Sequence, residues 1–390
     1  MLDRRTFLAQ TLAGMAVAPA AFRTADADPT SDASQELGVI LERVRAANSL
    51  PAMAAVAVRD GKIVAVNAVG VRKLGDPTPV TVEDRFHLGS CTKSMTATLA
   101  AMFIEQGKLD WQTTIEEVLG PAVPGIDPAL RRIPLIQLLC HWSGITTRNS
   151  PKDTTLGQLY SRGTLQGPPR EQRRRFCRLI LAEPPESTPG TQFAYSNLNY
   201  TIAGHMLETI ADQEWESLLT RRIAVPLKMP SVGFGAMGTP GKIDQPWQHR
   251  IIDGKPTPIE PGPNSDNPAV LGPGGTAHMT PSDWGRYLIA HVDGEQGLTP
   301  LLRPETWRKL HQPPYQGEQA LGWFQVRRNW GGPEGRVYNH SGTNNQNYAI
   351  VWMAPERRLA VGVLTNQGGD TARDAMDGVA SPVIREILRA

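Results

Sequence analysis

Apolar residues recur with helical spacing near the start of the chain and with strand-like clustering directly after it. A helix is predicted over 35–47 because its apolar positions share one face: Leu37, Ile40, Leu41 and Val44. Two apolar runs, 53–59 and 62–67, then flank the pair Asp60-Gly61. An Asp-Gly pair between two such runs is typical of a tight turn, so this region predicts a β-hairpin.

Strand-like runs return only near the other end of the chain. They cover 321–326, 337–340, 348–353 and 359–365, and a final helix is predicted over 371–388. Between the two ends, helical segments alternate with Pro- and Gly-rich loops; the clearest helical patterns are 135–140, 173–181 and 199–210. The pattern therefore predicts an α+β fold, with one sheet built from both chain ends, an all-α lobe over about 106–279, and a cleft between them.

The net charge of the chain is too small to attract a polyanionic partner. The formal net charge is +2, so we expect no nucleic acid to bind. The one basic cluster, Arg170–Arg175, is interpreted as the solvated start of a helix rather than as a binding patch. An apolar fraction of 40% and a charged fraction of 20% are ordinary for a globular protein.

Cysteine and histidine usage indicates neither a disulfide framework nor a metal site. The three cysteines lie in apolar settings and are predicted to be core residues: Cys91, Cys140 and Cys177. Six scattered histidines lack metal-ligand spacing and are interpreted as surface or structural: His141, His205, His249, His278, His291 and His311. No G-x-S-x-G occurs, so the nucleophile turn of Ser-His-Asp hydrolases is absent, and no cofactor is implied.

Residues 1–27 have the pattern of an export signal. Arg4-Arg5 is followed by an Ala-rich apolar stretch, and small residues at 18–20 and 25–27 offer cleavage sites. The stretch is too short and too rich in alanine to favour a membrane-spanning helix. The double arginine resembles a twin-arginine signal. We therefore expect a periplasmic or secreted protein without a stable membrane anchor after signal cleavage, in which 28–390 form a single domain.

The strongest chemical signal is the spacing of Ser90 and Lys93 at the start of a predicted helix. Gly89 ends a short apolar run, and a helical pattern follows as far as Gly107. Residues three apart share one helix face, and backbone N–H groups at a helix N-terminus favour negative charge on the serine oxygen. A lysine with a depressed pKa can take the serine proton, which makes Ser90 a candidate nucleophile.

A second candidate, Tyr195, precedes a predicted helix in the pattern Tyr195-Ser196-Asn197. A phenolate stabilised by nearby cations would act as a general base and later as the acid that protonates the leaving group. A half-buried core tyrosine would satisfy the same pattern. Asn197 is expected to orient Lys93 or a substrate amide.

A third pattern, His340-Ser341-Gly342-Thr343, lies at the end of a predicted strand. The glycine lets a substrate carbonyl approach the backbone, where the N–H of Thr343 can join that of Ser90 as an oxyanion hole. The segment 87–89 has the same H-x-G spacing, but it abuts Ser90 and is assigned a structural role in the strand-to-helix turn. Because an ordinary histidine titrates just below pH 7, any hold of His340 on a substrate carboxylate is expected to weaken as the pH rises.

The order S-x-x-K, Y-x-N, H-x-G resembles the serine β-lactamase and penicillin-binding hydrolase family, in its class C β-lactamase, DD-peptidase and family VIII esterase branch. The resemblance runs from about Leu37 to the C-terminus and includes 138–145, 195–200 and 272–275. It implies a β-lactamase/transpeptidase-like α+β fold, with an antiparallel sheet flanked by helices. It also implies roles for four residues: Ser90 as acylated nucleophile, Lys93 and Tyr195 as the proton-transfer pair, and Asn197 as a polar support.

One departure within this resemblance concerns His340, which stands where β-lactamases usually carry lysine. The motif is closer to the H-T-G-T pattern of DD-peptidases. We therefore expect an exported serine hydrolase that forms an acyl-Ser90 intermediate on an ester, amide or D-amino-acid peptide, with slow hydrolysis of penicillins and cephalosporins.

Other functions on the same scaffold stay open at this point. They are a β-lactamase proper, an acyltransferase, and a penicillin-binding sensor that is acylated without turnover. Residue content does not separate a hydrolase from a transferase, because the two differ in which acceptor reaches the acyl-enzyme. The expected partner is a small-molecule or peptide substrate, and the sequence leaves the oligomeric state open.

Overall fold

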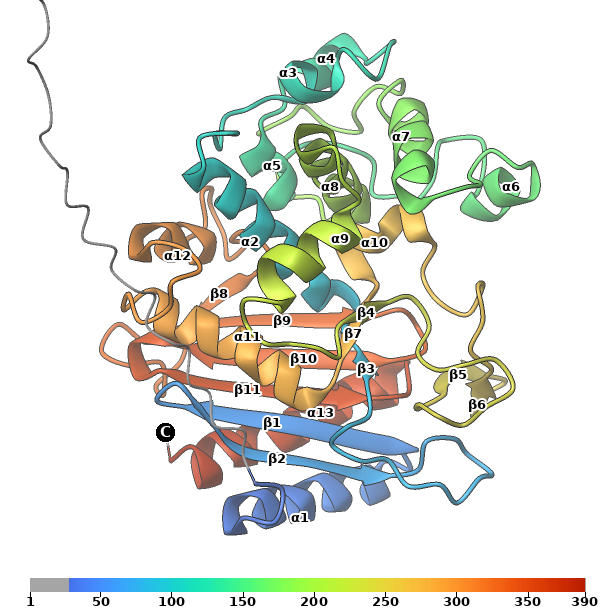
Figure 1. The fold of residues 1–390 in the computed structure, drawn as a ribbon. Helices are drawn as coiled ribbons and strands as arrows, with labels where there is room; N and C mark the ends of the chain where they lie inside the picture. Colours follow the sequence, from blue (N-terminus) through green and yellow to red (C-terminus); the bar gives the residue numbers. More distant parts are fainter. Residues whose placement is uncertain (1–27, 390) are drawn as a thin grey trace, which may run out of the picture.

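A six-stranded antiparallel sheet lies below a group of helices and is built from both ends of the chain (Figure 1). The computed structural model describes residues 28–389. The strand order is β2-β1-β11-β10-β9-β8, with these bounds: β1 (Ala52–Arg59), β2 (Lys62–Gly70), β8 (Phe324–Arg327), β9 (Arg336–Thr343), β10 (Tyr348–Ala354) and β11 (Leu359–Thr365). The predicted sheet formed from both chain ends is confirmed.

The β1–β2 hairpin turns at the dipeptide that the sequence indicated. Arg59 pairs with Lys62, and both turn residues have positive φ, 53° at Asp60 and 72° at Gly61. Positive φ at both positions matches the right-handed twist of the flanking strands. On its other side β1 pairs antiparallel with β11, so the last strand of the chain joins the first two to the rest of the sheet.

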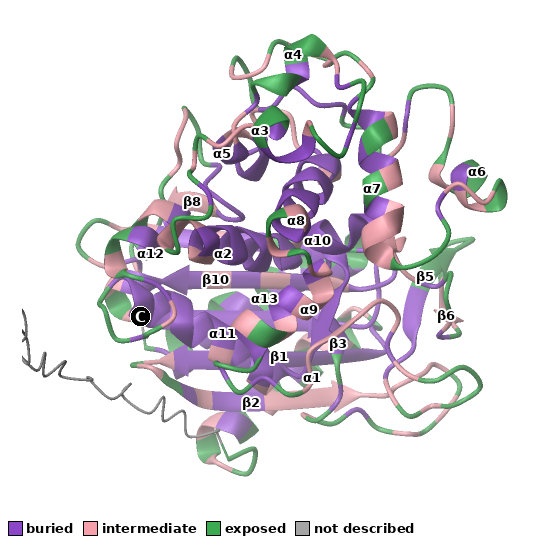
Figure 2. Cartoon of the chain, turned by 45° about the horizontal axis from the view of Figure 1, so that its top comes forward, coloured by how far each residue is buried: buried purple, intermediate pink, exposed green. Residues whose placement is uncertain are grey.

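Helices cover both faces of the sheet, because β1 is apolar on both sides. Alternate residues of a strand point to opposite faces, and those of β1 divide between two buried clusters: Met53, Ala55 and Ala57 in one, and Ala54, Val56 and Val58 in the other. The helices that complete the first cluster are α1 (Asp32–Ala47), α13 (Asp370–Pro382) and the π-helical η5 (Val383–Ile387). Helix α11 (Pro281–Gly294) packs on the second. Strand β1 is buried along nearly its whole length (Figure 2), and so is its neighbour β11.

The helical lobe lies over the sheet and supplies the other half of the molecule (Figure 1). Its elements are α2 (Thr92–Glu105), α3 (Ile115–Leu119), α4 (Pro128–Arg131), α5 (Leu135–Leu139), α6 (Leu156–Ser161), α7 (Pro169–Ile180), α8 (Asn197–Ala211), α9 (Trp215–Leu219) and η2 (Thr220–Ala224). Helices α2 and α8 are buried along most of their length. Lys93 near the start of α2 contacts Asn197 at the start of α8, so the N-terminal ends of the two central helices meet.

The prediction of an all-α lobe over about 106–279 is wrong in its last part, where the chain forms short strands. These are β4 (Gly233–Phe234), β5 (Gln248–Ile252), β6 (Lys255–Ile259) and β7 (Ala277–Met279). Strands β4 and β7 form a three-stranded sheet with β3 (Phe86–His87), and β5 and β6 form a hairpin. The frequent prolines and glycines of this region exclude a long helix, and strands of two or three residues leave no readable period.

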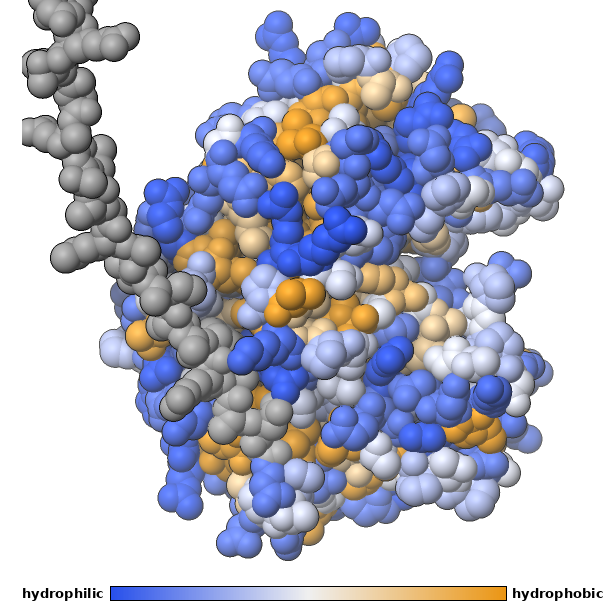
Figure 3. All heavy atoms as spheres, in the orientation of Figure 1, coloured by the Kyte–Doolittle hydropathy of each residue, from blue (hydrophilic) through white to orange (hydrophobic). Residues whose placement is uncertain are grey.

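Two further short helices lie in the second half of the chain, one between β6 and β7 and the other between α11 and β8. They are α10 (Gly272–Gly275) and α12 (Pro304–His311). Residues from the middle of the chain line a cavity of about 480 Å³, among them Pro169, Glu216 and Asp266. The outline of the molecule is also hollowed between the lobes on the side of β5 and β6 (Figure 3). The cleft between the lobes, as expected from the sequence, stays a prediction.

The cysteines and the scattered histidines are interior residues. All three cysteines are unpaired and buried, as predicted for core positions. The six histidines interpreted as surface or structural are all buried: His141, His205, His249, His278, His291 and His311. Within residues 28–389, no group of three or more potential metal ligands comes together. The histidines therefore serve the packing and hydrogen bonding of the interior.

Arg173 departs from the prediction that 170–175 form a solvated helix start. Its side chain is 0% exposed. The guanidinium donates to Glu208 Oε1 at 2.6 Å, to Glu216 Oε2 at 2.7 Å and to the Ala269 carbonyl at 2.7 Å. A buried charge is tolerated where opposite charges and hydrogen bonds compensate for lost hydration. Arg173 thus joins α7 to α8 and α9.

Replacement of Arg173 by methionine is expected to lower the free energy of unfolding by about 3–5 kcal/mol. The reason is that the buried carboxylate of Glu208 would lose its guanidinium partner. Arg174→Met is the matched control, because Arg174 lies on the same helix, pairs with Glu171 at 2.9 Å and is 44% exposed. This exposed pair should contribute no more than about 1 kcal/mol. Urea unfolding measures both changes, and equal losses in the two variants would contradict the assignment.

Candidate active site

Ser90 lies where β3 leads into α2, and a glycine makes the connection possible. Gly89 has a φ of +49°, a conformation that favours glycine, and a Cβ added there would lie 2.3 Å from the backbone nitrogen of Thr343. The 3₁₀ turn η1 (Gly89–Cys91) then continues into α2. Ser90 is partly exposed and sits at a helix N-terminus, where negative charge on its oxygen is favoured.

Lys93 is buried beside Ser90 and is held by groups from three parts of the chain. Its Nζ lies 2.9 Å from Ser90 Oγ, 2.7 Å from Asn197 Oδ1 and 2.7 Å from the Gly274 carbonyl. Burial lowers the pKa of Lys93 to about 7, because a charged ammonium loses its hydration there. A substantial fraction of Lys93 is therefore neutral near pH 7.

The hydrogen-bond partners of a neutral Lys93 amine leave its lone pair directed toward Ser90. Asn197 Oδ1 and the Gly274 carbonyl only accept hydrogen bonds, so they take the two N–H groups of a neutral Lys93. The remaining contact is with the hydroxyl of Ser90, which can donate its proton to the free lone pair. The arrangement is that of a general base next to a nucleophile.

Tyr195 completes the group around the serine but not in the form predicted from the sequence. Its hydroxyl donates to Ser90 Oγ at 2.9 Å, so the phenol shares the oxygen that Lys93 contacts. Burial raises the pKa of Tyr195 above its ordinary value of 10. This shift favours a protonated phenol over the phenolate that the sequence suggested, and the hydrogen bond to Ser90 Oγ places Tyr195 at the site rather than only in the core.

Ser196 places Tyr195 and Asn197 on either side of a helix start. Its side chain accepts from the backbone N–H of Leu198 at 3.3 Å and thereby caps α8. The same hydroxyl donates to the Thr146 carbonyl at 2.6 Å, which anchors the start of α8 to the neighbouring loop. Of the two roles expected for Asn197, the structure shows the first, a direct hydrogen bond with Lys93.

Gly342 and Thr343 bring the end of β9 against the backbone of Ser90. A Cβ added to Gly342 would lie 2.5 Å from Ser90 N and 2.0 Å from the Leu88 carbonyl oxygen. Only glycine allows this approach, which is matched by the contact between Gly89 and Thr343 N. These approaches bring the backbone segments of Ser90 and Thr343 together, which is the arrangement that an oxyanion hole formed by their N–H groups would need.

His340 lies nearby, but its environment removes the charge that the sequence left available. The side chain is buried, and its Nδ1 lies 2.7 Å from the Ser341 carbonyl. Burial, with a smaller contribution from the charge of Lys93, lowers the pKa of His340 to about 3. This shift opposes the titration near neutral pH that the sequence suggested, and the ring of Phe324 packs beside the imidazole with the two ring centroids 5.5 Å apart.

His141 is a residue of the site that sequence reasoning missed. Its ring packs on that of Tyr195 with the centroids 4.3 Å apart, and its Nδ1 lies 3.1 Å from Asn199 Nδ2. Burial lowers the pKa of His141 well below its usual value, so it supports Tyr195 as a neutral ring. The stretch 138–145 carried the signal, since it is part of the family resemblance, whereas the lack of metal-ligand spacing led to the interpretation of His141 as surface or structural.

Comparison with known proteins agrees with this geometry. The Beta-lactamase family model matches residues 40–381 of the chain. Penicillin-binding protein 4 of Amycolatopsis lactamdurans is 27% identical over 325 residues, which cover 78% of this chain and 78% of that protein.

Two solved structures share the fold. The octameric penicillin-binding protein homologue from Pyrococcus abyssi aligns with a TM-score of 0.71 and 20% identity over 91% of this chain and 77% of its own. The D-amino acid amidase from Ochrobactrum anthropi SV3 aligns with a TM-score of 0.69 and 20% identity over 92% of this chain and 98% of its own. The resemblance read from the motifs is confirmed along nearly the whole chain, and the protein belongs to the β-lactamase family of serine hydrolases.

Proposed function

We propose that the protein hydrolyses acyl substrates through an ester on Ser90, with neutral Lys93 as the base. The observation that carries this proposal is the placement of Ser90 Oγ 2.9 Å from both Lys93 Nζ and Tyr195 Oη. Ser90 Oγ attacks the substrate carbonyl carbon while its proton passes to Lys93. The N–H groups of Ser90 and Thr343 stabilise the negative charge that develops on the carbonyl oxygen.

Tyr195 serves the second half of acylation in this mechanism. When the tetrahedral intermediate collapses, the bond to the leaving group breaks and that group needs a proton. Tyr195 already donates to Ser90 Oγ, so its hydroxyl is positioned to pass the proton onward, and Lys93 returns one to the tyrosine. In deacylation a water molecule attacks the ester carbon, the ester bond to Ser90 breaks, and the water proton restores the serine hydroxyl.

The surroundings of His340 favour substrates that carry no carboxylate at this position. The imidazole is neutral across the physiological range, whereas a lysine would offer a fixed positive charge. Phe324 adds an apolar ring beside it. We therefore infer that simple esters and amides, including amides of D-amino acids such as the neighbouring amidase is named for, are better substrates than penicillins and cephalosporins.

A substrate panel tests this inference. Wild type is expected to hydrolyse a neutral p-nitrophenyl ester and a D-amino acid amide and to turn over a chromogenic cephalosporin slowly. His340→Lys should raise the rate on the cephalosporin relative to the neutral ester by about tenfold, the effect of one charge-assisted contact. His340→Asn is the matched control, because it changes the size of the side chain without adding charge.

Four results would contradict the proposal or the role it gives to charge at position 340. Efficient cephalosporin turnover by wild type would indicate a β-lactamase, and an acyl adduct that forms without turnover would indicate a sensor. Preferential transfer to an added alcohol or amine would indicate an acyltransferase. A shift in relative rates that is equal in His340→Lys and His340→Asn would remove the role of charge.

We also propose that the protein is exported by the twin-arginine route. The support is the pattern of residues 1–27, which lie outside the described residues. Within residues 28–389, the structure contains no helix long and apolar enough to cross a membrane. The periplasm or the exterior is the compartment in which cell-wall peptides and environmental esters are met.

A further inference from the structure

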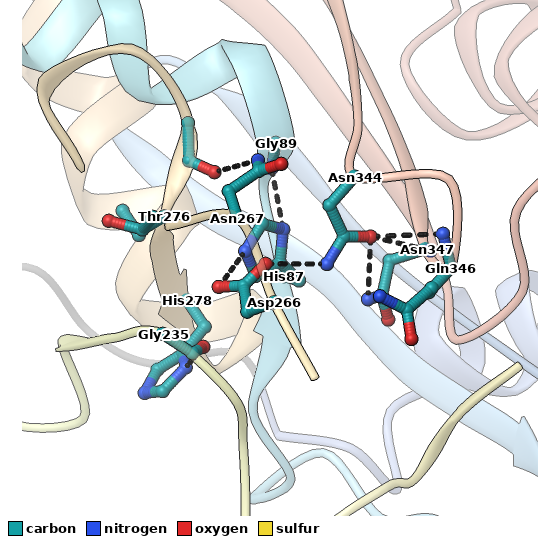
Figure 4. A network of polar contacts seen from close by, with 12 residues as sticks. His87, Gly89, Gly235, Asp266, Asn267, Thr276, His278, Asn344, Gln346 and Asn347 are labelled. Atoms are coloured by element: carbon teal, nitrogen blue, oxygen red, sulfur yellow. Dashed lines mark hydrogen bonds and ion pairs between the residues drawn. The ribbon is translucent and has the colours of Figure 1, made fainter. Parts of the chain in front are cut away.

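A buried carboxylate, Asp266, connects the two chain segments that flank the candidate oxyanion hole (Figure 4). Its side chain is 4% exposed. One carboxylate oxygen faces His87, two residues before Gly89, and the other faces Asn344, the residue after Thr343. Asp266 itself belongs to the loop between β6 and α10, so it joins three distant parts of the sequence.

The first connection runs through His87 to the residue before Ser90. The backbone N–H of Gly89 donates to His87 Nδ1 at 3.0 Å. Since Nδ1 accepts, the proton of the neutral ring is on Nε2, which lies 2.9 Å from Asp266 Oδ2. The carboxylate therefore holds the ring in the tautomer that binds the Gly89 N–H. This hydrogen bond within 87–89 is consistent with the structural role expected for that segment in the strand-to-helix turn.

The second connection runs through Asn344 to the residue after β9. The two amide hydrogens of Asn344 are donated to Asp266 Oδ1 and to Gln248 Oε1, each at 2.7 Å. Its oxygen accepts from the backbone N–H of Asn347 at 2.9 Å. Thr343 Oγ1 donates to the Asn347 carbonyl at 2.7 Å. Side chains of Thr343 and Asn344 thus both bind the backbone of Asn347, and these two hydrogen bonds hold the turn over 343–347.

Strand pairing does not set the distance between these two segments. Strand β9 pairs with β8 and β10, whereas β3 pairs with β7. The Gly89 and Gly342 contacts allow the backbones to approach, but a contact between glycines resists only compression. A hydrogen-bonded chain of His87, Asp266 and Asn344 resists separation as well.

We propose that Asp266 is a positioning residue that sets the spacing of the Ser90 and Thr343 N–H groups, acting through His87 and Asn344. The inference rests on the proposed acyl-Ser90 mechanism, because it assigns Asp266 to the stabilisation of that mechanism's oxyanion. Small errors in the position of such donors are costly, since they must meet charge that appears only in the transition state.

A carboxylate suits this position because both of its oxygens accept. His87 Nε2–H and the Asn344 amide approach Asp266 as donors from two sides. An asparagine at 266 has nearly the same shape but only one accepting oxygen, so its own amide hydrogens would face one of the two donors. Asp266→Asn therefore breaks the connection at one end without leaving a cavity.

Asp266→Asn is expected to slow acylation by a neutral p-nitrophenyl ester about 10- to 100-fold, somewhat less than the loss of a whole oxyanion-hole donor. The KM for that ester should change less than about threefold, because a ground-state carbonyl makes weaker use of the donors. The affinity for phenylboronic acid, which forms a tetrahedral adduct with an active serine, should fall by about the same factor as the acylation rate. A residue with a merely structural role would not couple these two quantities.

Asp244→Asn is the matched control. Asp244 is exposed and precedes the β5–β6 hairpin that Asp266 follows. It accepts from Thr239 N at 2.9 Å and from Thr239 Oγ1 at 2.7 Å, so it stabilises its loop without reaching Ser90 or Thr343. Its substitution should leave acylation and boronic acid affinity unchanged. Asn344→Ala removes one connection and keeps the other, and it should lower both quantities in the same direction as Asp266→Asn but less.

The outcomes separate the inference from the proposed function. An Asp266→Asn protein with lower thermal stability but wild-type acylation and boronic acid affinity would overturn the positioning role. So would equal effects of Asp266→Asn and Asp244→Asn. Failure of a fluorophosphonate to label Ser90 in wild type would instead overturn the acyl-Ser90 mechanism itself, and the inference with it.

Discussion

Turnover of a neutral ester is expected to fall at least about 10⁴-fold when Ser90 is replaced by alanine. The replacement removes the oxygen that both Lys93 and Tyr195 contact, and no acyl-enzyme can then form. The fold should be unaffected, because Ser90 is partly exposed and its side chain fills no core position. Steady-state hydrolysis and intact-protein mass spectrometry after incubation with a fluorophosphonate measure the two consequences.

Ser161→Ala is the control for this experiment. Ser161 is an exposed serine of α6, and its loss should leave both hydrolysis and labelling at wild-type levels. A well-folded Ser90→Ala protein that retained wild-type turnover would show that another group is the nucleophile. Labelling at a peptide other than the one containing Ser90 would have the same meaning.

Replacement of Lys93 by methionine is expected to slow acylation by about 10²- to 10⁴-fold, the contribution typical of a general base. Methionine has a similar length and no charge, and the lysine it replaces is buried, so the variant should fold. Rapid-mixing measurement of the acylation burst separates this step from deacylation. Lys108→Met, at an exposed lysine just beyond the end of α2, should leave the burst unchanged.

The pH profile gives an independent readout of the same residue. Only neutral Lys93 can accept the serine proton, and its pKa is lowered to about 7. Below that pH the ammonium form dominates, so kcat/KM should rise by about tenfold per pH unit and level off above neutrality. The residual activity of Lys93→Met should not show this rise of kcat/KM with pH. A wild-type profile that is flat from pH 5 to pH 9 would contradict the assignment of Lys93 as the base.

Tyr195→Phe extends this test, because Tyr195 and Lys93 are proposed to act on one proton path. Each single variant should acylate slowly, and the double variant should be little slower than Lys93→Met alone. Residues that act as a unit show such non-additive effects. If Tyr195→Phe is acylated at the wild-type rate, Tyr195 serves only packing.

By itself the sequence determined the features that depend on neighbours along the chain. The hairpin at Asp60-Gly61 follows from a local requirement for positive φ. The Ser90–Lys93 pair follows from helical spacing, which places residues three apart on one face. The family was also readable from the order of three short motifs, since each motif is a local segment whose residue types carry the chemistry.

Only the tertiary structure decided the protonation states of the site. The pKa values of Lys93, Tyr195 and His340 are set by burial, which comes from groups far away in the sequence, such as the Gly274 carbonyl that contacts Lys93 across 181 positions. The sequence indicated a phenolate at Tyr195 and a titrating His340, whereas burial favours the neutral form of both side chains.

The same reason explains the two buried charges whose partners the sequence did not indicate. Arg173 lies in a run of basic residues typical of a surface, yet its carboxylate partners come from the next two helices. Asp266 lies in a loop without a recognisable motif, and its partners, His87 and Asn344, are separated by more than half of the chain. Local spacing decides which side chains share a helix face or a turn, whereas the loss of water around a charge depends on every segment that packs against it.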